Sequence, residues 1–376
     1  MTLLKVIFFL IVLNLVSITA YGQNKWKIAS TFPSNLVIIG ELGVRITEKI
    51  NNNSNNSLYL KYFEPGALVP PLEIFDAVSS GAVDAGWSTP GYWAGKIPAL
   101  QIFSSLPFHY NIDDHNEWIW NQGGFQKMNK IYNKYNIQSI PCGLVTSEGF
   151  GWFKNKITNI EDLQGLKMRF FGLGAKVMDK VGANTMLLAG GDIYPALELG
   201  TIDATEFAPP YIDIELGFYQ VAKYYYYPSW HQPFALLELM INLDSWNSIS
   251  LDQQLLIVSE CKNNINFGLV KQESLIPEAL KKIESKGVII NVTPKSIMPY
   301  LKSAWEEILI HERRNNEEFN SVYMAWLNRK KEKHITAKDY VYQQYVSLNK
   351  DKKIIEKNVN MIKTKKNTPN IDFAVP

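Results

Sequence analysis

One local pattern occurs twice in this chain, and it restricts the folds that the sequence can adopt. In the first copy, a helix expected over 72–80 ends at Gly81 and precedes a short strand. In the second copy, a helix expected over 192–199 ends at Gly200 and again precedes a short strand. A helix that a glycine ends just before a strand is typical of β-α-β units. The repetition favours two similar α/β lobes over one large sheet, and a length of 376 residues agrees with two domains.

The other expected elements fit this plan. Strands are expected over 26–31, 58–63, 82–87, 165–170, 185–188 and 204–207, and helices over 36–50 and 174–181. The polar tract at 51–57 predicts a surface loop. Apolar residues recur at helical spacing over 299–327, which predicts a long helical region near the carboxyl end. Thr336 and Asp339 resemble a capping box that opens a further helix through about residue 362.

Composition excludes several classes of protein. Apolar residues make up 46% of the chain, and 38 Lys and Arg face 36 Asp and Glu for a net charge of +2. A chain this apolar folds around a hydrophobic core. A net charge this small provides no strongly positive surface for binding nucleic acid. Cys142 and Cys261 are too few for a disulfide framework or a cysteine-rich zinc site, and their pairing is left open.

The first 22 residues have the features of a secretory signal peptide. Lys5 precedes an apolar run over 6–16, and Ala20-Tyr21-Gly22 resembles a cleavage site. The run is shorter than the about 20 residues that span a membrane, although an uncleaved amino-terminal anchor is the alternative. We therefore expect a mature protein that begins near Gln23 and works outside the cytoplasm.

A lysine-rich segment lies at the other end of the chain. Seven lysines in 349–370 face only Asp351 and Glu356. A solvated helix face is the simpler interpretation, and docking onto an anionic membrane or partner is the alternative.

Enzyme motifs in the sequence are incomplete. His311-Glu312 begins like the HExxH zinc motif, but Asn315 stands where the second histidine is required. Gly172-Leu173-Gly174 lacks the third glycine of a dinucleotide loop, and the five histidines have no metal-ligand spacing. These patterns favour a binding protein over an enzyme.

Two charged residues stand in apolar segments. Arg169 lies between Met168 and Phe170, and a guanidinium suits a carboxylate held by two parallel hydrogen bonds. Glu206 precedes Phe207, and a buried carboxylate must be paired or bind a metal ion. Two interpretations stay open: Arg169 binds an anionic guest, or Arg169 and Glu206 form an internal ion pair.

Further acids and aromatic residues have a similar setting. Glu148 precedes Gly149-Phe150-Gly151-Trp152, and Glu238 lies among leucines. The aromatic residues singled out are Tyr92, Trp93, Tyr194, Tyr211 and Trp230. Such a lining suits a small organic anion, although a plain hydrophobic core is the alternative.

Several segments resemble the periplasmic solute receptors of TRAP transporters, the DctP-type family. They are Gly165-Leu166-Lys167-Met168-Arg169, the run IYPALELGTIDA over 193–204, and Glu206. Pro90-Gly91-Tyr92-Trp93 together with the run over 217–226 is most similar to the branch that binds 2-oxo or 2-hydroxy monocarboxylates such as pyruvate and lactate. The resemblance covers about residues 26–330.

The resemblance implies roles for particular residues. Arg169 would hold the carboxylate of the ligand, while Glu206 and the backbone carbonyl of Phe207 would hold a metal ion beside it. Glu148 would be the third metal ligand at a position where members of the branch carry Gln, and Glu238 is a weaker candidate. A second carboxylate raises the negative charge and favours calcium over sodium as the metal ion. Tyr92, Trp93 and Tyr211 would contact the ligand.

The expected architecture is a two-lobed fold of the periplasmic-binding-protein type. Lobe I is expected to comprise 24–145 plus 233–277, lobe II 146–232 plus 278–298, and a helical region 299–365 would brace both. Lobes that close over a ligand exclude water from it. The expected partners are a small carboxylate, the membrane subunits of a TRAP transporter and, through the carboxyl-terminal helices, a second copy of the chain. The rival hypotheses are a secreted metal-dependent enzyme acting on 2-oxo acids and a sensory ligand-binding module.

Overall fold

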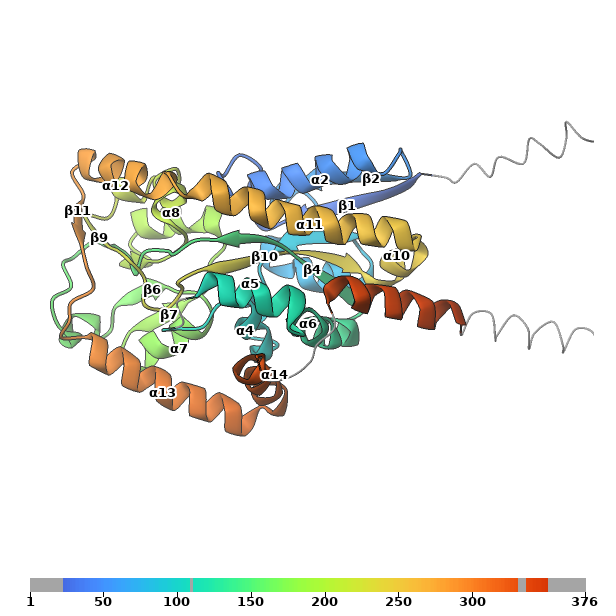
Figure 1. Ribbon diagram of the computed structural model, residues 1–376. Helices are drawn as coiled ribbons and strands as arrows, with labels where there is room; N and C mark the ends of the chain where they lie inside the picture. Colours follow the sequence, from blue (N-terminus) through green and yellow to red (C-terminus); the bar gives the residue numbers. More distant parts are fainter. Residues whose placement is uncertain (1–22, 109–110, 331–335, 351–376) are drawn as a thin grey trace, which may run out of the picture.

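The computed structural model describes residues 23–108, 111–330 and 336–350. The expected signal peptide and most of the lysine-rich segment lie outside the described residues. Within them the chain forms two sheets surrounded by helices (Figure 1). The prediction of an α/β fold with two sheets is therefore confirmed.

The first sheet has the strand order β2-β1-β3-β10-β4. Its strands are β1 (Asn24–Ser30), β2 (Leu58–Phe63), β3 (Ala85–Ser88), β4 (Ile137–Val145) and β10 (Ala235–Asn242). β1 is parallel to β2 and β3, while β10 runs antiparallel to β3 and β4. Every residue of β4 and β10 is buried, so these two strands form the centre of the core.

Helices pack on both faces of the first sheet (Figure 1). They are α2 (Glu41–Asn53), α3 (Ile74–Ser80), α4 (Gln101–Ser104), α5 (Ile112–Asn121), α6 (Gly124–Tyr132), α10 (Leu243–Ser248) and α11 (Leu251–Gln272). The expected helix 36–50 starts later, as α2, because Ile38 adopts a left-handed backbone conformation with a φ of 63°. α3 ends at Gly81 as predicted, with a φ of 76° that favours glycine.

The second sheet has the strand order β11-β9-β5-β8-β6-β7. Its strands are β5 (Gly151–Phe153), β6 (Lys167–Arg169), β7 (Asn184–Met186), β8 (Ala204–Thr205), β9 (Tyr224–Tyr226) and β11 (Ile289–Asn291). Its helices are α7 (Gly172–Lys180), α8 (Gly190–Glu198), α9 (Pro210–Asp213) and α12 (Leu275–Ser285). β6 lies between its parallel neighbours β7 and β8, so the carboxyl ends of these three strands lie at one edge.

Two segments, 146–150 and 227–234, connect the two sheets. They lie side by side, because Ser229 N–H donates to the carbonyl of Glu148 at 2.9 Å and Phe150 N–H donates to the carbonyl of Tyr226 at 2.8 Å. Side chains on these segments are therefore held between the lobes.

The two cysteines form a disulfide. Cys142 on β4 pairs with Cys261 on α11, although 119 positions separate them in the sequence. This bond settles the pairing that the sequence left open, and it fixes α11 against β4, the last strand of the first sheet.

The expected helical region over 299–327 consists of two helices, α13 (Met298–Asn315) and α14 (Glu317–Asn328). Asn316 separates them because its extended backbone ends α13 and its side chain accepts a hydrogen bond from Phe319 N–H at the start of α14. α13 packs on α7 of the second sheet, and α14 packs on α4 of the first (Figure 1). Residues 337–350 form a further helix, which the predicted pair Thr336 and Asp339 caps.

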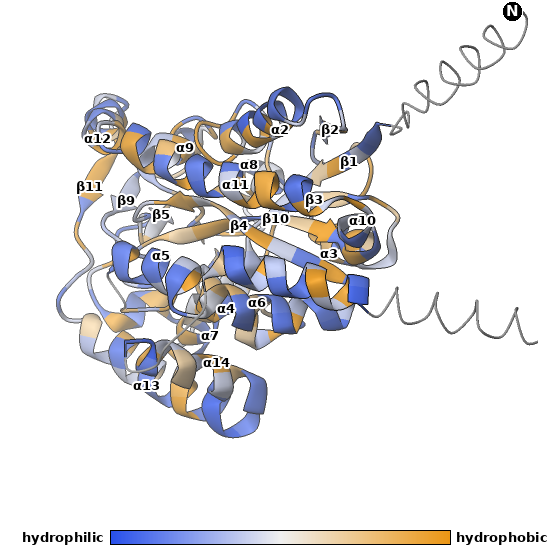
Figure 2. Cartoon of the chain, turned by 45° about the vertical axis from the view of Figure 1, so that its right-hand side comes forward, coloured by the Kyte–Doolittle hydropathy of each residue, from blue (hydrophilic) through white to orange (hydrophobic). Residues whose placement is uncertain are grey.

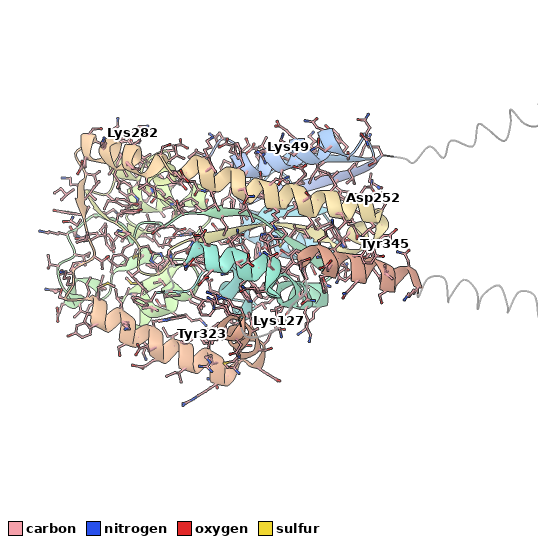
Figure 3. The ribbon with its side chains drawn as sticks, viewed as in Figure 1. Lys49, Lys127, Asp252, Lys282, Tyr323 and Tyr345 are labelled. Carbon is pink, nitrogen blue, oxygen red and sulfur yellow. A yellow bond between two sulfur atoms is a disulfide. The ribbon has the colours of Figure 1, made fainter. Side chains whose placement is uncertain are left out.

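Hydropathy follows this layering. Apolar residues concentrate on the strands and on the inner faces of the helices, whereas the outer faces are polar (Figure 2). Side chains such as Lys49, Asp252 and Lys282 extend outward from their helices (Figure 3). Among the described residues, no helix combines the length and the hydrophobicity that crossing a membrane requires.

Candidate functional site

The site begins at the carboxyl ends of β6 and β8. The two strands are parallel, and Arg169 at the end of β6 is in register with Thr205 at the end of β8. Glu206 follows directly, so a cation and an anion lie next to each other at the strand ends. Ligands of α/β sheets commonly bind at this edge.

Arg169 is almost fully buried, with 1% of its surface exposed. Its Nη1 donates to Oε1 of Glu206 at 2.7 Å and to the carbonyl of Glu206 at 2.8 Å. Its Nε donates to the carbonyl of Leu188 at 3.2 Å. The internal ion pair that the sequence left open is therefore present. These contacts use Nε and Nη1, and the same guanidinium also lines a cavity.

Two buried carboxylates each have an oxygen without a hydrogen-bond partner among the described residues. Glu148 accepts from Nε2 of Gln232 at 2.6 Å through Oε1, but its Oε2 has no partner. Glu206 uses Oε1 for Arg169, and its Oε2 has no partner. A buried oxygen of this kind is costly unless something binds it.

The electrostatic environments of the two carboxylates differ. Burial, reinforced by the negative charge of Glu206, raises the pKa of Glu148 well above its usual range. Burial, the largest influence, would raise the pKa of Glu206 too, but Arg169, His231 and the backbone of Phe171 together outweigh it and the pKa of Glu206 is lowered. A cation between the two would favour the charged form of both.

His231 joins the two carboxylates. Its Nε2 lies 3.9 Å from Oε2 of Glu148 and 3.8 Å from Oε2 of Glu206, and it has no hydrogen-bond partner among the described residues. Burial lowers the pKa of His231, which favours the neutral imidazole. Glu148, Glu206 and His231 each offer one ligand atom, and these atoms all lie within 4.8 Å of one another. The donor set therefore fits a metal cation.

A small cavity lies beside this group, and both lobes line it. The first lobe contributes Tyr92 and the second contributes Arg169, while Glu148 comes from a connecting segment. The other lining residues are Phe32, Ile39, Thr89, Val145, Phe171, Phe207, Ala208, Gln232, Ala235 and Leu237. The cavity has a volume of about 30 Å³, which leaves room only for a small guest.

The lobes meet closely at the rim of this cavity. A Cβ atom added to Gly91 would lie 2.1 Å from a ring carbon of Phe171, so only glycine allows this approach. The rings of Tyr92 and Phe171 pack edge to face with centroids 5.2 Å apart. Contacts between the lobes therefore form part of the cavity wall.

Comparison with protein families matches most of the chain. The family described as bacterial extracellular solute-binding protein, family 7 (DctP), matches residues 28–311. The chain belongs to this family. The resemblance seen in the sequence is thereby confirmed, and the family consists of extracellular receptors for solutes.

Individual family 7 relatives are similar over most of their length. A monocarboxylate 2-oxoacid-binding periplasmic protein from a Nostoc species is 33% identical over 304 residues, covering 80% of this chain and 83% of the relative. A TRAP periplasmic solute-binding protein from Pseudoalteromonas atlantica T6c, solved with bound sodium and pyruvate, is 28% identical with a TM-score of 0.78 and covers 82% and 94% of the two chains. Another, from Colwellia psychrerythraea with bound calcium and pyruvate, is 29% identical with a TM-score of 0.78 and covers 90% and 100%.

The structure of this family 7 protein brings only some of the predicted site residues together. Tyr92 lines the cavity, and burial raises its pKa to about 12, so its hydroxyl stays protonated. The ring of Phe207 lines the cavity and lies 5.2 Å from the Arg169 guanidinium. Trp93 points elsewhere and donates to Oε1 of Glu238 at 3.0 Å. Tyr211 donates to Oε1 of Gln272 and is not among the residues that line the cavity.

Glu238 lies apart from the metal-binding group of this family 7 protein. Its carboxylate accepts hydrogen bonds from Trp93 Nε1 at 3.0 Å, Tyr132 OH at 2.8 Å and Ser139 Oγ at 2.6 Å. β10 places it against β4 inside the first sheet. The structure therefore does not bring Glu238 to Glu148 and Glu206.

Sequence reasoning did not find His231, Gln232 or Asp213. Asp213 is buried near the group, where Trp152 Nε1 donates to it at 2.8 Å and burial raises its pKa well above the usual range. These residues come from separate segments, so no spacing motif connects them. The available signal was local: His231 follows Trp230 in a segment rich in aromatic residues, and such a setting indicates burial.

Proposed function

We propose that this family 7 protein is the periplasmic receptor of a TRAP transporter and that it captures a small 2-oxo or 2-hydroxy monocarboxylate such as pyruvate. One observation carries the proposal. Two buried carboxylates, Glu148 and Glu206, each have an oxygen without a hydrogen-bond partner among the described residues, and Glu148 lines a cavity between the lobes together with Arg169. The similar proteins named above, which bind 2-oxo acids or hold pyruvate together with sodium or calcium, support it.

Charge balance favours a cation together with an anionic ligand. Arg169 offsets only one of the two carboxylates, Glu148 and Glu206. A divalent cation and a monocarboxylate would bring the whole group to neutrality, whereas sodium would leave one negative charge in a buried site. Among ions bound by oxygen alone, this balance favours calcium over sodium.

The roles of the side chains follow from their positions. The ion would lie against the unpartnered oxygens of Glu148 and Glu206, with the backbone carbonyl of Phe207 as a further ligand. The Arg169 guanidinium would hold the carboxylate of the guest with the Nη2 nitrogen that its internal contacts leave over. The 2-oxo or 2-hydroxy oxygen of the ligand would bind the ion. Simple fatty acids lack this oxygen, so the site would discriminate against them.

The proposed pathway begins outside the cytoplasm. A leader over 1–22 would export the chain, and the loaded receptor would pass its ligand to membrane subunits. We expect ligand binding without turnover, because the site offers a guanidinium for the carboxylate of the ligand and two carboxylates for an ion beside it. Pairing of two copies through the carboxyl-terminal helices stays a prediction.

A thermal-shift screen tests this function. Protein treated with chelator is mixed with pyruvate, lactate, acetate or succinate, with calcium, sodium or no ion added back. Binding to the native state alone raises stability by about 2.7 kcal/mol at a ligand concentration one hundred times Kd. We expect pyruvate and lactate to raise Tm in the presence of the ion, and acetate and succinate to leave it unchanged. A shift that acetate produces equally would contradict the proposal.

The matching control separates a receptor from an enzyme. Pyruvate is incubated with the ion-loaded protein at a micromolar concentration and recovered for quantification. We expect it to return unchanged. Product formation would instead favour the hypothesis of a metal-dependent enzyme acting on 2-oxo acids.

A further inference from the structure

The segment that follows β8 carries two of the groups proposed to hold the ion, the carboxylate of Glu206 and the backbone carbonyl of Phe207. The register of β8 with β6 ends at Thr205, and Glu206 N–H makes one more bond, to the carbonyl of Arg169 at 3.3 Å. The pairing of the sheet stops there. It therefore does not set the orientation of the next peptide group, between Phe207 and Ala208.

The buried side chain of Asp213 binds this peptide group. Asp213 is the last residue of α9 and is 1% exposed. Its Oδ1 accepts from Ala208 N–H at 3.0 Å, and its Oδ2 accepts from Nε1 of Trp152 at 2.8 Å. Trp152 in turn is in register with Thr205 across β5 and β8. The carboxyl group therefore connects the peptide group after Glu206 to the sheet.

The same peptide group contains the proposed ion ligand. The N–H of Ala208 and the carbonyl of Phe207 share one plane, and in a trans peptide group they point in opposite directions. A bond that holds the N–H toward Asp213 therefore directs the carbonyl away from Asp213. Phe207 and Ala208 both line the cavity, so their peptide group lies beside it. Among the described residues, no hydrogen bond to the Phe207 carbonyl is found, which leaves this oxygen available to an ion.

Asp213 differs from the acids that would bind the ion themselves. Each of its oxygens accepts a hydrogen bond from the protein. Glu148 and Glu206 instead each keep one oxygen without a partner in the described part of the chain. A side chain whose two oxygens are both used can orient a ligand without being one, as the partners of metal ligands commonly do.

We propose that Asp213 is a positioning residue for the ion, because it holds the Phe207–Ala208 peptide group with the Phe207 carbonyl free to complete the ligand set. Residues that hold a metal ligand in place typically contribute about 10–100-fold to metal affinity. The inference rests on the proposed function, since it concerns how one ligand of the same ion is oriented.

The test follows one carbonyl group by nuclear magnetic resonance. Protein labelled with ¹³C at the carbonyl of Phe and with ¹⁵N at Ala gives an HNCO signal only for Phe–Ala pairs, which occur at 207–208, 234–235 and 373–374. The variant Ala208→Gly removes one signal and thereby assigns it. We expect Ca²⁺ alone, added to chelator-treated protein, to shift the carbonyl frequency of the 207–208 signal more than those of the other two.

Two variants separate positioning from stability. Asp213→Ala removes the acceptor of Ala208 N–H, so the carbonyl of the 207–208 signal should lose its response to Ca²⁺ and the affinity for Ca²⁺ should fall by about tenfold or more. Trp152→Phe is the matched control, because it removes only the other hydrogen bond of Asp213. It should lower stability but weaken Ca²⁺ binding less than Asp213→Ala does. Calorimetric titration measures both affinities.

One readout needs no variant and so decides the matter even if Asp213→Ala does not fold. The Ala208 amide should exchange slowly with D₂O before and after Ca²⁺ is added, because Asp213 holds it in both states. Fast exchange in the loaded protein would overturn the inference.

The remaining outcomes distinguish the inference from the proposed function. An unshifted Phe207 carbonyl in the wild type, or undiminished Ca²⁺ affinity in Asp213→Ala, would overturn the role of Asp213. If pyruvate still binds with Ca²⁺ in either case, the proposed function stands without this inference. If the carbonyl responds to Ca²⁺ as expected but no 2-oxo acid binds, the proposed function fails while the role of Asp213 survives.

Discussion

Two groups of buried carboxylates in this molecule look alike in sequence and differ in structure. Glu238 in the first sheet receives three hydrogen bonds, from Trp93, Tyr132 and Ser139. Glu148 and Glu206 at the second sheet each keep one oxygen without a partner among the described residues. A complete set of donors stabilises a carboxylate within the fold, whereas an incomplete set leaves it available to a cation.

The comparison teaches that burial of an acid does not by itself indicate a site. All three acids are at most 3% exposed. A structural carboxylate differs from a binding one in the number of hydrogen-bond donors around it. A cavity also lies beside Glu148. Variants of the two regions should therefore have different effects.

Removal of Arg169 should have the largest effect. Arg169→Ala leaves Glu206 buried without its cationic partner, which costs about 3–5 kcal/mol of stability. The same change should abolish the thermal shift produced by every acid, because a hydrogen bond to a charged group contributes about 1.5–3 kcal/mol. Arg314→Ala on the exposed face of α13 serves as the control. A folded Arg169→Ala protein with an undiminished shift would show that Arg169 does not hold the ligand.

Loss of the disulfide should affect the first sheet and spare the site. A double change of Cys142 and Cys261 to Ser opens a loop of 119 residues and should lower the free energy of unfolding by about 2–5 kcal/mol. Denaturant titration measures this loss, and calorimetry measures affinity for pyruvate on the folded fraction. If the affinity for pyruvate falls by as much free energy as the stability does, the disulfide and the binding site are coupled.

Glu238 should make the free energy of unfolding depend on pH. Burial raises its pKa from 4.5 to about 7, so the folded protein binds this proton more tightly than the unfolded chain does. Its contribution to stability is complete below about pH 4.5 and falls as the pH rises to 7, by about 3 kcal/mol in all. Glu238→Gln resembles the protonated acid and should remove this fall. Denaturant curves between pH 4 and 8 compare the two proteins, and identical pH dependence would refute the assignment.

Glu148→Gln should have the smallest effect of the four. The amide removes one negative charge but keeps an oxygen ligand, so affinity for a divalent ion should fall by about tenfold, or 1.4 kcal/mol. Without ion the variant should be more stable than the wild type, since an amide avoids both the cost of burying a carboxylate and its repulsion by Glu206. Titration of stripped protein measures both changes. Unchanged affinity for the divalent ion would place Glu148 outside the ligand set.

The sequence predicted the fold better than the site. Apolar spacing and the glycines that end α3 and α8 were sufficient for two α/β units, because these signals are local. Arg169, Glu206 and Glu148 were recognisable as charges in apolar segments. The donors around Glu238 and the position of His231 depend on pairing between distant strands, and no pattern along the chain reports that pairing. The same reason left the Cys142–Cys261 bond undecided.

Calorimetric titration of pyruvate into chelator-treated protein, before and after one equivalent of a divalent ion is restored, tests the central claim directly. The account predicts no binding before the ion is restored and roughly micromolar binding afterwards, because the ion would bind the 2-oxo oxygen of the guest and offset the charges of Glu148 and Glu206. Equal affinity with and without the ion would contradict it.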